Sequence, residues 1–534
     1  MAQVTRREWR WAAVFAASVM ALTTLPYVVG YAAQTSAWRF GGFLIGVDDG
    51  NSYIAKMGEG ARGAWLFTLP YSSEPQRGVL IYTFYLALGK LAGTNHDTQV
   101  LVFHLARVVF GFALMLVSYR FLAEFLPRVY QRRVALALVA LGGGLGWLLT
   151  LLGWGQLFGS LPIDFYSPET YSFLILYLLP HLAAARCLFL LGLLAYWRGR
   201  GVAAGLLFFG VSLIQPLYVI VAWAILTADF VLGWWAARRN TQSAIQNTQP
   251  SAVRAPRPTP QAWRSLIVTT GLSAPLVLYT LALFATDPLI NQWGKQNVLF
   301  SPHPLHYLFG YGVLLLLAAF GWRAFAHRWP RLARFTAAWA VAVPFLIYAP
   351  LSTQRRLIEG FQLPLVAVAV WGLTVTLRRL RRWILIPVLA LTLPTSAVLL
   401  AGGVGGALVL VEPIFHPADQ LAAFDWLTHH AQAGQVALAT YGTGNALPAY
   451  TPLIAYIGHG SETVFLSAKE GRVIRFYQSA TSDADRRQLL AEGRIAFVIL
   501  HAHERNRADF NPDAVNYLRW RFSSGDYSIY EVIR

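Results

Sequence analysis

The chain has 534 residues, of which 56% are hydrophobic and only 13% are charged. Because a soluble domain carries about 25% charged residues, this composition excludes an ordinary soluble protein. The net charge of +18 would suit a nucleic-acid-binding protein. However, the basic residues stand in short clusters between apolar runs and form no binding face, so we expect no nucleic-acid partner. The one cysteine, Cys187, lies in an apolar run, which excludes an internal disulfide.

Apolar runs long enough to cross a bilayer as helices recur along the chain, so we expect a polytopic α-helical protein of the cell (plasma or inner) membrane. The first run lacks a signal-peptide cleavage site and is expected to stay as an anchor. Arginine clusters between alternate runs favour a cytoplasmic amino terminus. The apolar segment 79–92 does not fit this alternation, so we expect it to lie along the membrane or to re-enter it. About eleven spans are predicted by length and hydropathy, at residues 10–31, 99–123, 134–153, 171–197, 201–215, 216–237, 265–286, 306–326, 335–351, 357–377 and 384–410.

The pattern divides the chain into a transmembrane part, residues 1–411 with a large external loop at 32–98, and a different carboxyl-terminal part. Residues 238–264 are polar and contain proline, which predicts a flexible cytoplasmic linker. Strand-like and helix-like runs alternate from residue 412 onward, which predicts a small extracytoplasmic α/β domain over 412–534. The strand-like runs are 435–440, 453–458, 495–500 and 527–532, and the helix-like runs are 417–432 and 482–493.

Two adjacent acids, Asp48 and Asp49, follow the first apolar run in the stretch "GFLIGVDDGNSYIAKMGEGARGAWLF", residues 42–67. This placement puts both carboxylates in the first external loop, close to the membrane. One interpretation is N-capping of a helix that begins near Tyr53. The other is a functional pair of carboxylates, with Gly50 permitting a tight turn that aims one of them at the membrane face. The two interpretations are compatible, because a cap can fix the second carboxylate in place.

The second external loop, "GSLPIDFYSPETYSF", adds Asp164 and Glu169, and His181 follows in the next apolar run. Carboxylates near a membrane are costly unless they are solvated, paired or metal-bound. Oxygen ligands of this kind suit Mg²⁺ or Mn²⁺, so Asp164, Glu169 and His181 are candidate metal ligands. The alternatives are surface acids and a histidine that only packs between helices.

Arg355 and Arg356 lie at the external end of an apolar run, in "YAPLSTQRRLIEGFQLP", against the general placement of positive charge. Arginines at this depth can simply extend their charged ends to the interface. The functional interpretation is a phosphate clamp, because guanidinium groups bind phosphate oxygens bidentately and remain charged. We expect Glu359 to orient one of the two arginines.

The arrangement resembles the GT-C glycosyltransferase superfamily, which includes protein mannosyltransferases, aminoarabinose transferases and oligosaccharyltransferases. Members share many spans, an acid-bearing first external loop, acids in the second external loop and a carboxyl-terminal external domain. The segment "DDGNSYIAKMGEGARG" is similar to that first loop. It departs from the family pattern because Asn51 and Ser52 separate Gly50 from the aromatic Tyr53. The chain lacks a Trp-Trp-Asp motif, which argues against an oligosaccharyltransferase proper.

The resemblance implies an inverting transfer of a sugar from a polyprenyl-phosphate donor in the bilayer to an extracytoplasmic acceptor, whose identity the sequence leaves open. It implies that Asp49 is the general base and Asp48 its support. The departing phosphate would be stabilised by Arg355, Arg356 or a metal held by Asp164 and Glu169. In "YIGHGSET", His459 and Glu462 could contact the acceptor, or the Gly-His-Gly step could be only a turn. Alternative functions are a membrane glycan polymerase or ligase, a transporter or flippase of lipid-linked sugars, and a non-catalytic sensor.

Overall fold

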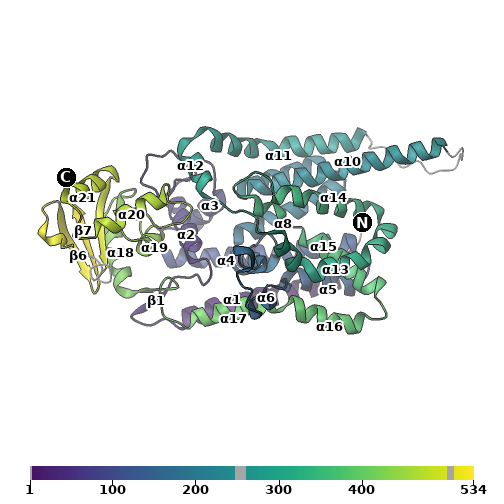
Figure 1. Cartoon of the computed structure of the whole chain (residues 1–534), viewed down its shortest axis with the longest axis horizontal. Coiled ribbons are helices and arrows are strands. Elements are labelled where there is room, and N and C mark those ends of the chain that lie inside the picture. The colour runs from purple at the N-terminus through teal and green to yellow at the C-terminus, as the bar shows by residue number, and fades with distance from the viewer. Residues whose placement is uncertain (1–2, 247–259, 502–509, 534) are drawn as a thin grey trace. The chain divides into compact units, whose positions relative to one another are not determined.

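The computed structural model describes residues 3–246, 260–501 and 510–533 (Figure 1). The chain folds into two compact units, each assembled from three stretches of sequence. Unit 1 comprises residues 1–24, 106–282 and 299–401. Unit 2 comprises residues 25–105, 283–298 and 402–534, so the carboxyl-terminal segment folds together with the first long loop.

Eight helices of the described chain are long and apolar enough to cross a membrane. This agrees with the predicted polytopic helical protein, but the predicted count of about eleven spans is not confirmed. The eight stretches are Arg6–Ala32, His96–Phe125, Pro180–Trp197, Pro216–Arg238, Pro260–Thr286, Pro304–Arg328, Gln354–Thr376 and Arg382–Ala407.

Helices also occupy the other three predicted spans, but they are shorter or more polar than expected. The prediction at 134–153 is divided between α5 (Val129–Leu141) and α6 (Gly146–Leu151), because the glycines at 142–144 interrupt the helix. The prediction at 201–215 forms α9 (Gly201–Ile214), which has 14 residues. The prediction at 335–351 falls in α14 (Pro330–Ile347), whose first turns carry two arginines. Segment 79–92 forms only the short α3 (Thr83–Ala92), which is too short to span a bilayer.

The predicted linker 238–264 is wrong at both ends. Helix α10 (Pro216–Gln246) continues beyond residue 238, and α11 (Pro260–Thr286) begins before residue 264. The Arg238 guanidinium lies 3.7 Å from the ring centre of Trp234, one turn earlier, so this side chain packs against its own helix. Residues 247–259 of the predicted linker lie outside the described residues.

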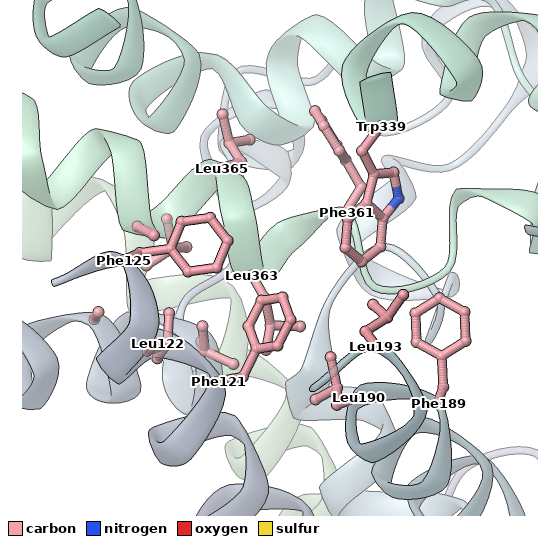
Figure 2. Packing of buried hydrophobic residues seen from close by; sticks show 14 of the residues in the cluster. Phe121, Leu122, Phe125, Phe189, Leu190, Leu193, Trp339, Phe361, Leu363 and Leu365 are labelled. Atoms are coloured by element: carbon pink, nitrogen blue, oxygen red, sulfur yellow. The ribbon is translucent and has the colours of Figure 1, made fainter. Parts of the chain in front are cut away.

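The core of unit 1 consists of apolar side chains that meet where the long helices cross (Figure 2). Phe189 of α8 (Pro180–Trp197) lies 5.9 Å from Trp339 of α14, measured between ring centres. Helix α13 (Pro304–Arg328) packs against α15 (Gln362–Trp371). Just beyond this contact a Cβ on Gly321 would lie 2.6 Å from the Cα of Gly372, so the two backbones can approach only because both residues are glycine.

Unit 2 combines the loop helices with a mixed sheet. Strands β1 (Trp38–Phe40) and β2 (Phe415–Pro417) pair antiparallel and join the first loop to the carboxyl-terminal segment. Helix α2 (Val47–Ala61) packs on α3. Unit 2 also contains the short helix α12 (Pro288–Gln296). The sheet has the order β4-β3-β5-β7-β6, with β3 parallel to β4 and β5 and the remaining pairs antiparallel. Its strands are β3 (Val436–Leu438), β4 (Ile454–Ala455), β5 (Ile495–His501), β6 (Leu518–Ser524) and β7 (Tyr527–Val532).

Helices cover both faces of this sheet. Side chains along β5 therefore alternate between two cores, one on each face. Val498 and Leu500 join the core under α20 (Leu466–Phe476) and α21 (Asp483–Glu492). Phe497 and Ile499 join the core that includes α18 (Ala418–His430) and α19 (Tyr441–Tyr450). All four predicted strand segments contain a strand, and both predicted helices are present. Strand β6 was missed because its residues, "LRWRFSS", are mostly exposed and polar.

Candidate functional site

Helix α2 presents the two adjacent acids. It begins at Val47, after Gly46 adopts a left-handed φ of 63°, so the predicted start near Tyr53 is wrong. Asp48 and Asp49 therefore lie in the first helical turn and neither is the N-cap residue. Their charges complement the positive end of the helix dipole. The carboxylates are thus oriented by the helix while remaining able to contact other groups.

Gly50 serves packing and not a turn, which corrects the prediction. It lies inside α2, and a Cβ on it would come 2.4 Å from Cγ of Phe43. The absence of a side chain lets the Phe43 ring press against the first turn of the helix. This contact holds the turn that carries Asp48 and Asp49.

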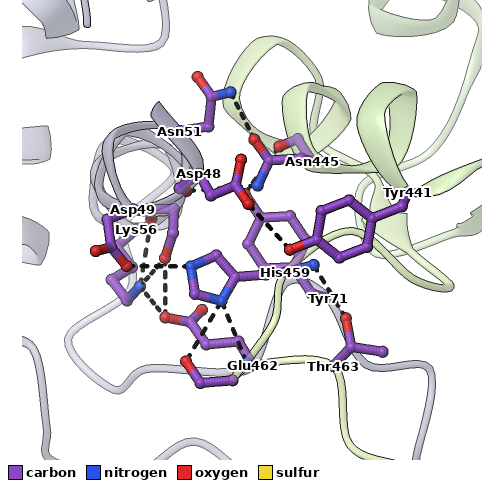
Figure 3. A network of polar contacts seen from close by, with 12 residues as sticks. Asp48, Asp49, Asn51, Lys56, Tyr71, Tyr441, Asn445, His459, Glu462 and Thr463 are labelled. Atoms are coloured by element: carbon purple, nitrogen blue, oxygen red, sulfur yellow. Dashed lines mark hydrogen bonds and ion pairs between the residues drawn. The ribbon is translucent and has the colours of Figure 1, made fainter. Parts of the chain in front are cut away.

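Asp49 points toward a buried histidine (Figure 3). Its side chain is 64% exposed, and its Oδ1 lies 3.3 Å from Nε2 of His459, whose side chain is 6% exposed. On the other side of the ring, Nδ1 accepts the backbone N–H of Glu462 at 3.3 Å. Because Nδ1 is an acceptor, the neutral ring carries its proton on Nε2, facing Asp49. Burial alone would lower the pKa of His459, but Asp49 and the Glu462 carboxylate together raise it above its ordinary value.

Asp48 has a different partner, from the carboxyl-terminal segment. The hydroxyl of Tyr441 donates to Asp48 Oδ2 at 3.0 Å. The side chain of Asn445 donates to the backbone oxygen of Asp48 at 3.4 Å and accepts from Asn51 at 2.8 Å. These contacts tie the first turn of α2 to α19. Burial, followed by the charge of Asp48, raises the pKa of the Tyr441 hydroxyl, so it remains a donor.

A buried ion pair lies close to the His459 ring. Lys56 Nζ lies 2.6 Å from Glu462 Oε1, and Ser52 donates to the same oxygen at 2.8 Å. Burial would raise the pKa of Glu462, but Lys56 and then His459 outweigh burial and hold it below its ordinary value. Glu462 is only 3% exposed, which corrects the expectation that it contacts an acceptor. It is a positioning residue, because its backbone N–H orients the His459 ring.

The acids open into a pocket of about 580 Å³ within unit 2, here called the aspartate pocket. Asp49 and His459 lie on its wall, as do Asp48 and Tyr441. This arrangement offers an exposed carboxylate that can accept a proton, beside a histidine that can hold it in place. The full lining is Leu44, Gly46, Val47, Asp48, Asp49, Pro413, Ile414, Tyr441, His459, Gly460 and Ser461.

Asp164, in unit 1, fixes the break between α5 and α6. Its Oδ2 accepts the backbone N–H groups of Gly144 at 3.0 Å and Gly146 at 3.2 Å and the hydroxyl of Thr395 at 2.7 Å. Burial raises the pKa of Asp164 although these donors oppose the change. The carboxylate therefore satisfies the backbone donors of a broken helix.

Glu169 and the two arginines of unit 1 lie near one another. Glu169 is buried, and its Oε1 lies 3.7 Å from Nε of Arg356. The Arg355 guanidinium lies 4.5 Å from the ring centre of Tyr166. Nε of Arg355 is buried and has no hydrogen-bond partner among the residues that the structure describes. Both arginine side chains are half-buried in the short helix η3 (Gln354–Ile358).

Glu359 does not orient either arginine, which corrects that prediction. Its carboxylate binds Arg186 instead, with N–O distances of 2.5 Å and 2.7 Å. Both side chains are fully buried in the helices of unit 1. Arg186 also donates to Ser172, so this pair links α8, α7 (Ser172–Leu178) and the segment after η3.

The predicted metal ligands are not gathered into one site. His181 lies in the first turn of α8, Asp164 binds backbone donors, and Glu169 lies beside Arg356. Across residues 3–246, 260–501 and 510–533, no three His, Cys, Asp or Glu side chains are placed to hold a metal ion. The described residues therefore do not fit the expected Mg²⁺ or Mn²⁺ site.

Three residues of the site, Lys56, Tyr441 and Asn445, were missed from the sequence. Tyr441 and Asn445 lie nearly 400 positions from their partners on α2, so no local pattern relates them. Lys56 did carry a signal. It is the one basic residue in the apolar and acidic stretch 42–61, and a lone charge on the buried side of an amphipathic helix requires an opposite charge nearby.

No family profile and no curated protein matches the sequence. Solved structures do match. The apo oligosaccharyltransferase of Archaeoglobus fulgidus is 12% identical, with a TM-score of 0.55, over 93% of this chain and 70% of that one. The same enzyme in complex with Zn and sulfate is 14% identical, with a TM-score of 0.52, over 92% of this chain and 68% of that one. The arabinofuranosyltransferase AftD from Mycobacteria gives 14% identity and a TM-score of 0.54 over 99% of this chain and 40% of its own. These likenesses confirm the expected GT-C fold.

Proposed function

We propose that this chain is an integral membrane glycosyltransferase that moves a sugar from a polyprenyl-phosphate donor to an acceptor hydroxyl, with inversion at the anomeric carbon. The observation that carries the proposal is the exposed Asp49 carboxylate in the aspartate pocket, 3.3 Å from the buried His459. The shared fold with an oligosaccharyltransferase and an arabinofuranosyltransferase supports the reaction class. The lipid-phosphate donor follows from the resemblance of the first loop to the family.

The proposed step is a single displacement. The acceptor oxygen attacks the anomeric carbon and forms the new C–O bond, while the bond from that carbon to the phosphate oxygen breaks. Asp49 takes the proton of the acceptor hydroxyl, and polyprenyl phosphate leaves with the bonding electrons. His459 holds the Asp49 carboxylate through Nε2 and is therefore a positioning residue. Asp48, bound by Tyr441, supports the same helical turn.

We also propose that Arg355 and Arg356 bind the donor phosphate. Guanidinium groups suit phosphate oxygens because their planar donors match two oxygens at once. Two observations support Arg355 in particular. Its Nε is a buried donor with no hydrogen-bond partner in the described part of the chain, and the Tyr166 ring holds the guanidinium in place. Nearby Glu169 lies 3.7 Å from Arg356 and would orient it.

The function is tested by incubating the purified protein, in lipid, with a panel of polyprenyl-phosphate sugars and measuring the release of polyprenyl phosphate, with water taking the place of the acceptor hydroxyl. We expect one donor to be cleaved by the wild type and not by Asp49→Asn. The matched control is Asp425→Asn, which alters an exposed His–Asp pair, with His429 at 3.6 Å, outside the aspartate pocket. If no donor is cleaved and a labelled donor instead crosses sealed vesicles intact, the protein is a transporter and the proposal is wrong.

A further inference from the structure

A second hollow lies beside the aspartate pocket, within unit 2. It has a volume of about 730 Å³, in the usual range for small-molecule sites, and is here called the tyrosine pocket after Tyr441, Tyr477 and Tyr527. The two pockets share Asp48, Pro413 and Tyr441 as wall residues. The hydrogen bond between Tyr441 and Asp48 thus stands where both pockets meet. A molecule in the tyrosine pocket would be adjacent to the carboxylates of α2.

The charge of the tyrosine pocket restricts its ligand. Asp48 and Glu412 lie on its wall, and no Lys or Arg is among the described residues that line it. A phosphate, a phospholipid headgroup or an acidic peptide would meet carboxylates with no compensating cation among the described wall residues. The described wall therefore disfavours an anionic ligand.

The wall combines flat rings with short hydrogen-bonding groups. The rings of His501 and Tyr527 stack with centres 4.5 Å apart, and the Tyr477 hydroxyl is fixed by donation to the backbone oxygen of Ile499 at 2.9 Å. Thr443 and Gln478 add polar groups, whereas Ile474 and Pro413 are the aliphatic side chains on the described wall. A saccharide has this dual character, since its C–H face packs on rings while its hydroxyls donate and accept.

His416 adds no positive charge to the wall of the tyrosine pocket. His416 is 2% exposed, and its Nδ1 lies 2.7 Å from the oxygen of the Gln420 amide, so this nitrogen carries the proton. Nε2 is then an acceptor, and it is buried with no hydrogen-bond partner among the described residues. Burial lowers the pKa of His416 to about 4, so the ring remains neutral at physiological pH. The Nε2 nitrogen faces Gly41, where a Cβ would lie 2.9 Å away, so it is not offered to a ligand in the pocket.

We infer that the tyrosine pocket binds a neutral saccharide, and that the acceptor of this transferase is a glycan hydroxyl presented from this pocket toward Asp49. The part of this inference that makes the saccharide an acceptor rests on the proposed function. The saccharide site itself is argued from the tyrosine pocket alone. The inference names the substrate class that the sequence left open.

Gly442 offers a way to fill the pocket without disturbing its wall. It is exposed in the first turn of α19, it lines the tyrosine pocket only, and a Cβ on it would meet no atom within 4 Å. Gly442→Leu therefore occupies the hollow, whereas Gly442→Ala leaves most of it open. Ile474→Trp fills it from α20 and serves if Gly442→Leu does not fold. The control is Ala468→Leu, an exposed position in the first turn of α20 that lines neither pocket.

The experiment measures binding of malto-, manno- and cellohexaose to the full chain in lipid nanodiscs by saturation-transfer NMR, with a neutral hexapeptide as the competing class. We expect at least one hexasaccharide to bind, at least tenfold more weakly in Gly442→Leu and Ile474→Trp, and unchanged in Ala468→Leu. The inference is overturned if only the hexapeptide binds, if no hexasaccharide binds, or if binding is equal in all variants. Saccharide binding without cleavage of any lipid-linked donor would instead refute the proposed transferase and leave the saccharide site standing.

Discussion

Two neighbouring carboxylates in one helical turn have unlike surroundings. Asp48 is half-buried and accepts from Tyr441, whereas Asp49 is 64% exposed and lies beside His459. A helix advances about 100° per residue, so adjacent side chains point in different directions. Under the proposed function, this difference gives the two acids different roles, because the exposed Asp49 is the one that an incoming hydroxyl can reach.

We predict that Asp49→Asn lowers turnover by about 10²–10⁴-fold, the usual contribution of a general base. Asparagine keeps the shape of the side chain but cannot take the proton, so the variant should still fold and donor binding should be nearly unchanged. Asp48→Asn should cost less, since Tyr441 can still bind the amide oxygen. The measurement is single-turnover donor cleavage, with Asp425→Asn as the control. Full activity in Asp49→Asn would remove it from the reaction, and a larger loss in Asp48→Asn would reverse the two roles.

We predict that Arg355→Ala weakens donor binding, because a hydrogen bond to a charged group contributes about 1.5–3 kcal/mol, or roughly 10- to 150-fold in affinity. Arg355→Lys should restore only part of this, since an ammonium lacks the planar fork. Arg356→Ala should behave similarly. The measurement is the dissociation constant of a fluorescent polyprenyl-phosphate sugar. Arg323→Ala, an exposed arginine near the end of α13, is the control. Unchanged affinity in both alanine variants would leave the pair as interface anchors.

The His459–Asp49 pair should make stability depend on pH in a defined direction. Folding raises the pKa of His459, so the pair stabilises the fold fully below the ordinary value of 6.5, and this contribution is lost as pH rises through the folded pKa. We therefore expect the thermal midpoint of the wild type to exceed that of Asp49→Asn by more at pH 6 than at pH 9. The difference between the thermal midpoints of the wild type and Asp425→Asn should be the same at both pH values. A gap that widens toward pH 9 would contradict this account.

At the scale of elements, α2 and α3 pack unusually closely. A Cβ on Gly89 of α3 would lie 1.9 Å from the backbone oxygen of Met57, and one on Gly60 of α2 would lie 2.0 Å from that of Leu86. The two glycines thus let the backbones touch on both sides of the contact. This contact supports the helix that carries Asp49, which is why a change far from the pocket can affect the site.

We predict that Gly89→Ala destabilises the fold by about 1–3 kcal/mol, because the added methyl must separate two backbones. Gly271→Ala in α11 is the matched control, since a Cβ there meets nothing within 4 Å. Its better helix propensity should leave stability equal or higher, by up to about 1 kcal/mol. The measurement is the midpoint of thermal unfolding in detergent. Equal midpoints for Gly89→Ala and the wild type would show that the helices can separate at no cost.

The whole molecule has a predicted orientation in the membrane. The arginine clusters predict a cytoplasmic amino terminus, residues 238–264 inside and the carboxyl terminus outside. Reporter fusions at 250 and at 534 should therefore report opposite sides. A reporter inserted near residue 63, in the first loop, should report the same side as 534. If 250 and 534 report the same side, the number of spans is wrong and the external placement of Asp49 no longer follows.

The sequence by itself determined the features that depend on local pattern. Apolar runs predicted the helices of unit 1, and alternation after residue 412 predicted four strand positions and two helices, since burial on one face imposes a period on the residues concerned. The first loop indicated Asp48 and Asp49. Helix boundaries differed from the predictions at the start of α2 and along α10, because helix ends depend on packing and on the conformation of single residues such as Gly46.

The tertiary structure alone decided which distant side chains meet. His459 faces Asp49, Tyr441 binds Asp48, and Lys56 pairs with Glu462, each across about 400 positions of the chain. Glu359 pairs with Arg186, although the sequence had suggested that it orients Arg355 or Arg356. Asp164 accepts from backbone N–H groups, although the sequence had suggested a metal ligand. The physical reason is that a buried charge needs an oppositely charged or hydrogen-bonding partner, but that partner comes from a distant part of the chain. The residues next to the charge in the sequence therefore do not identify it.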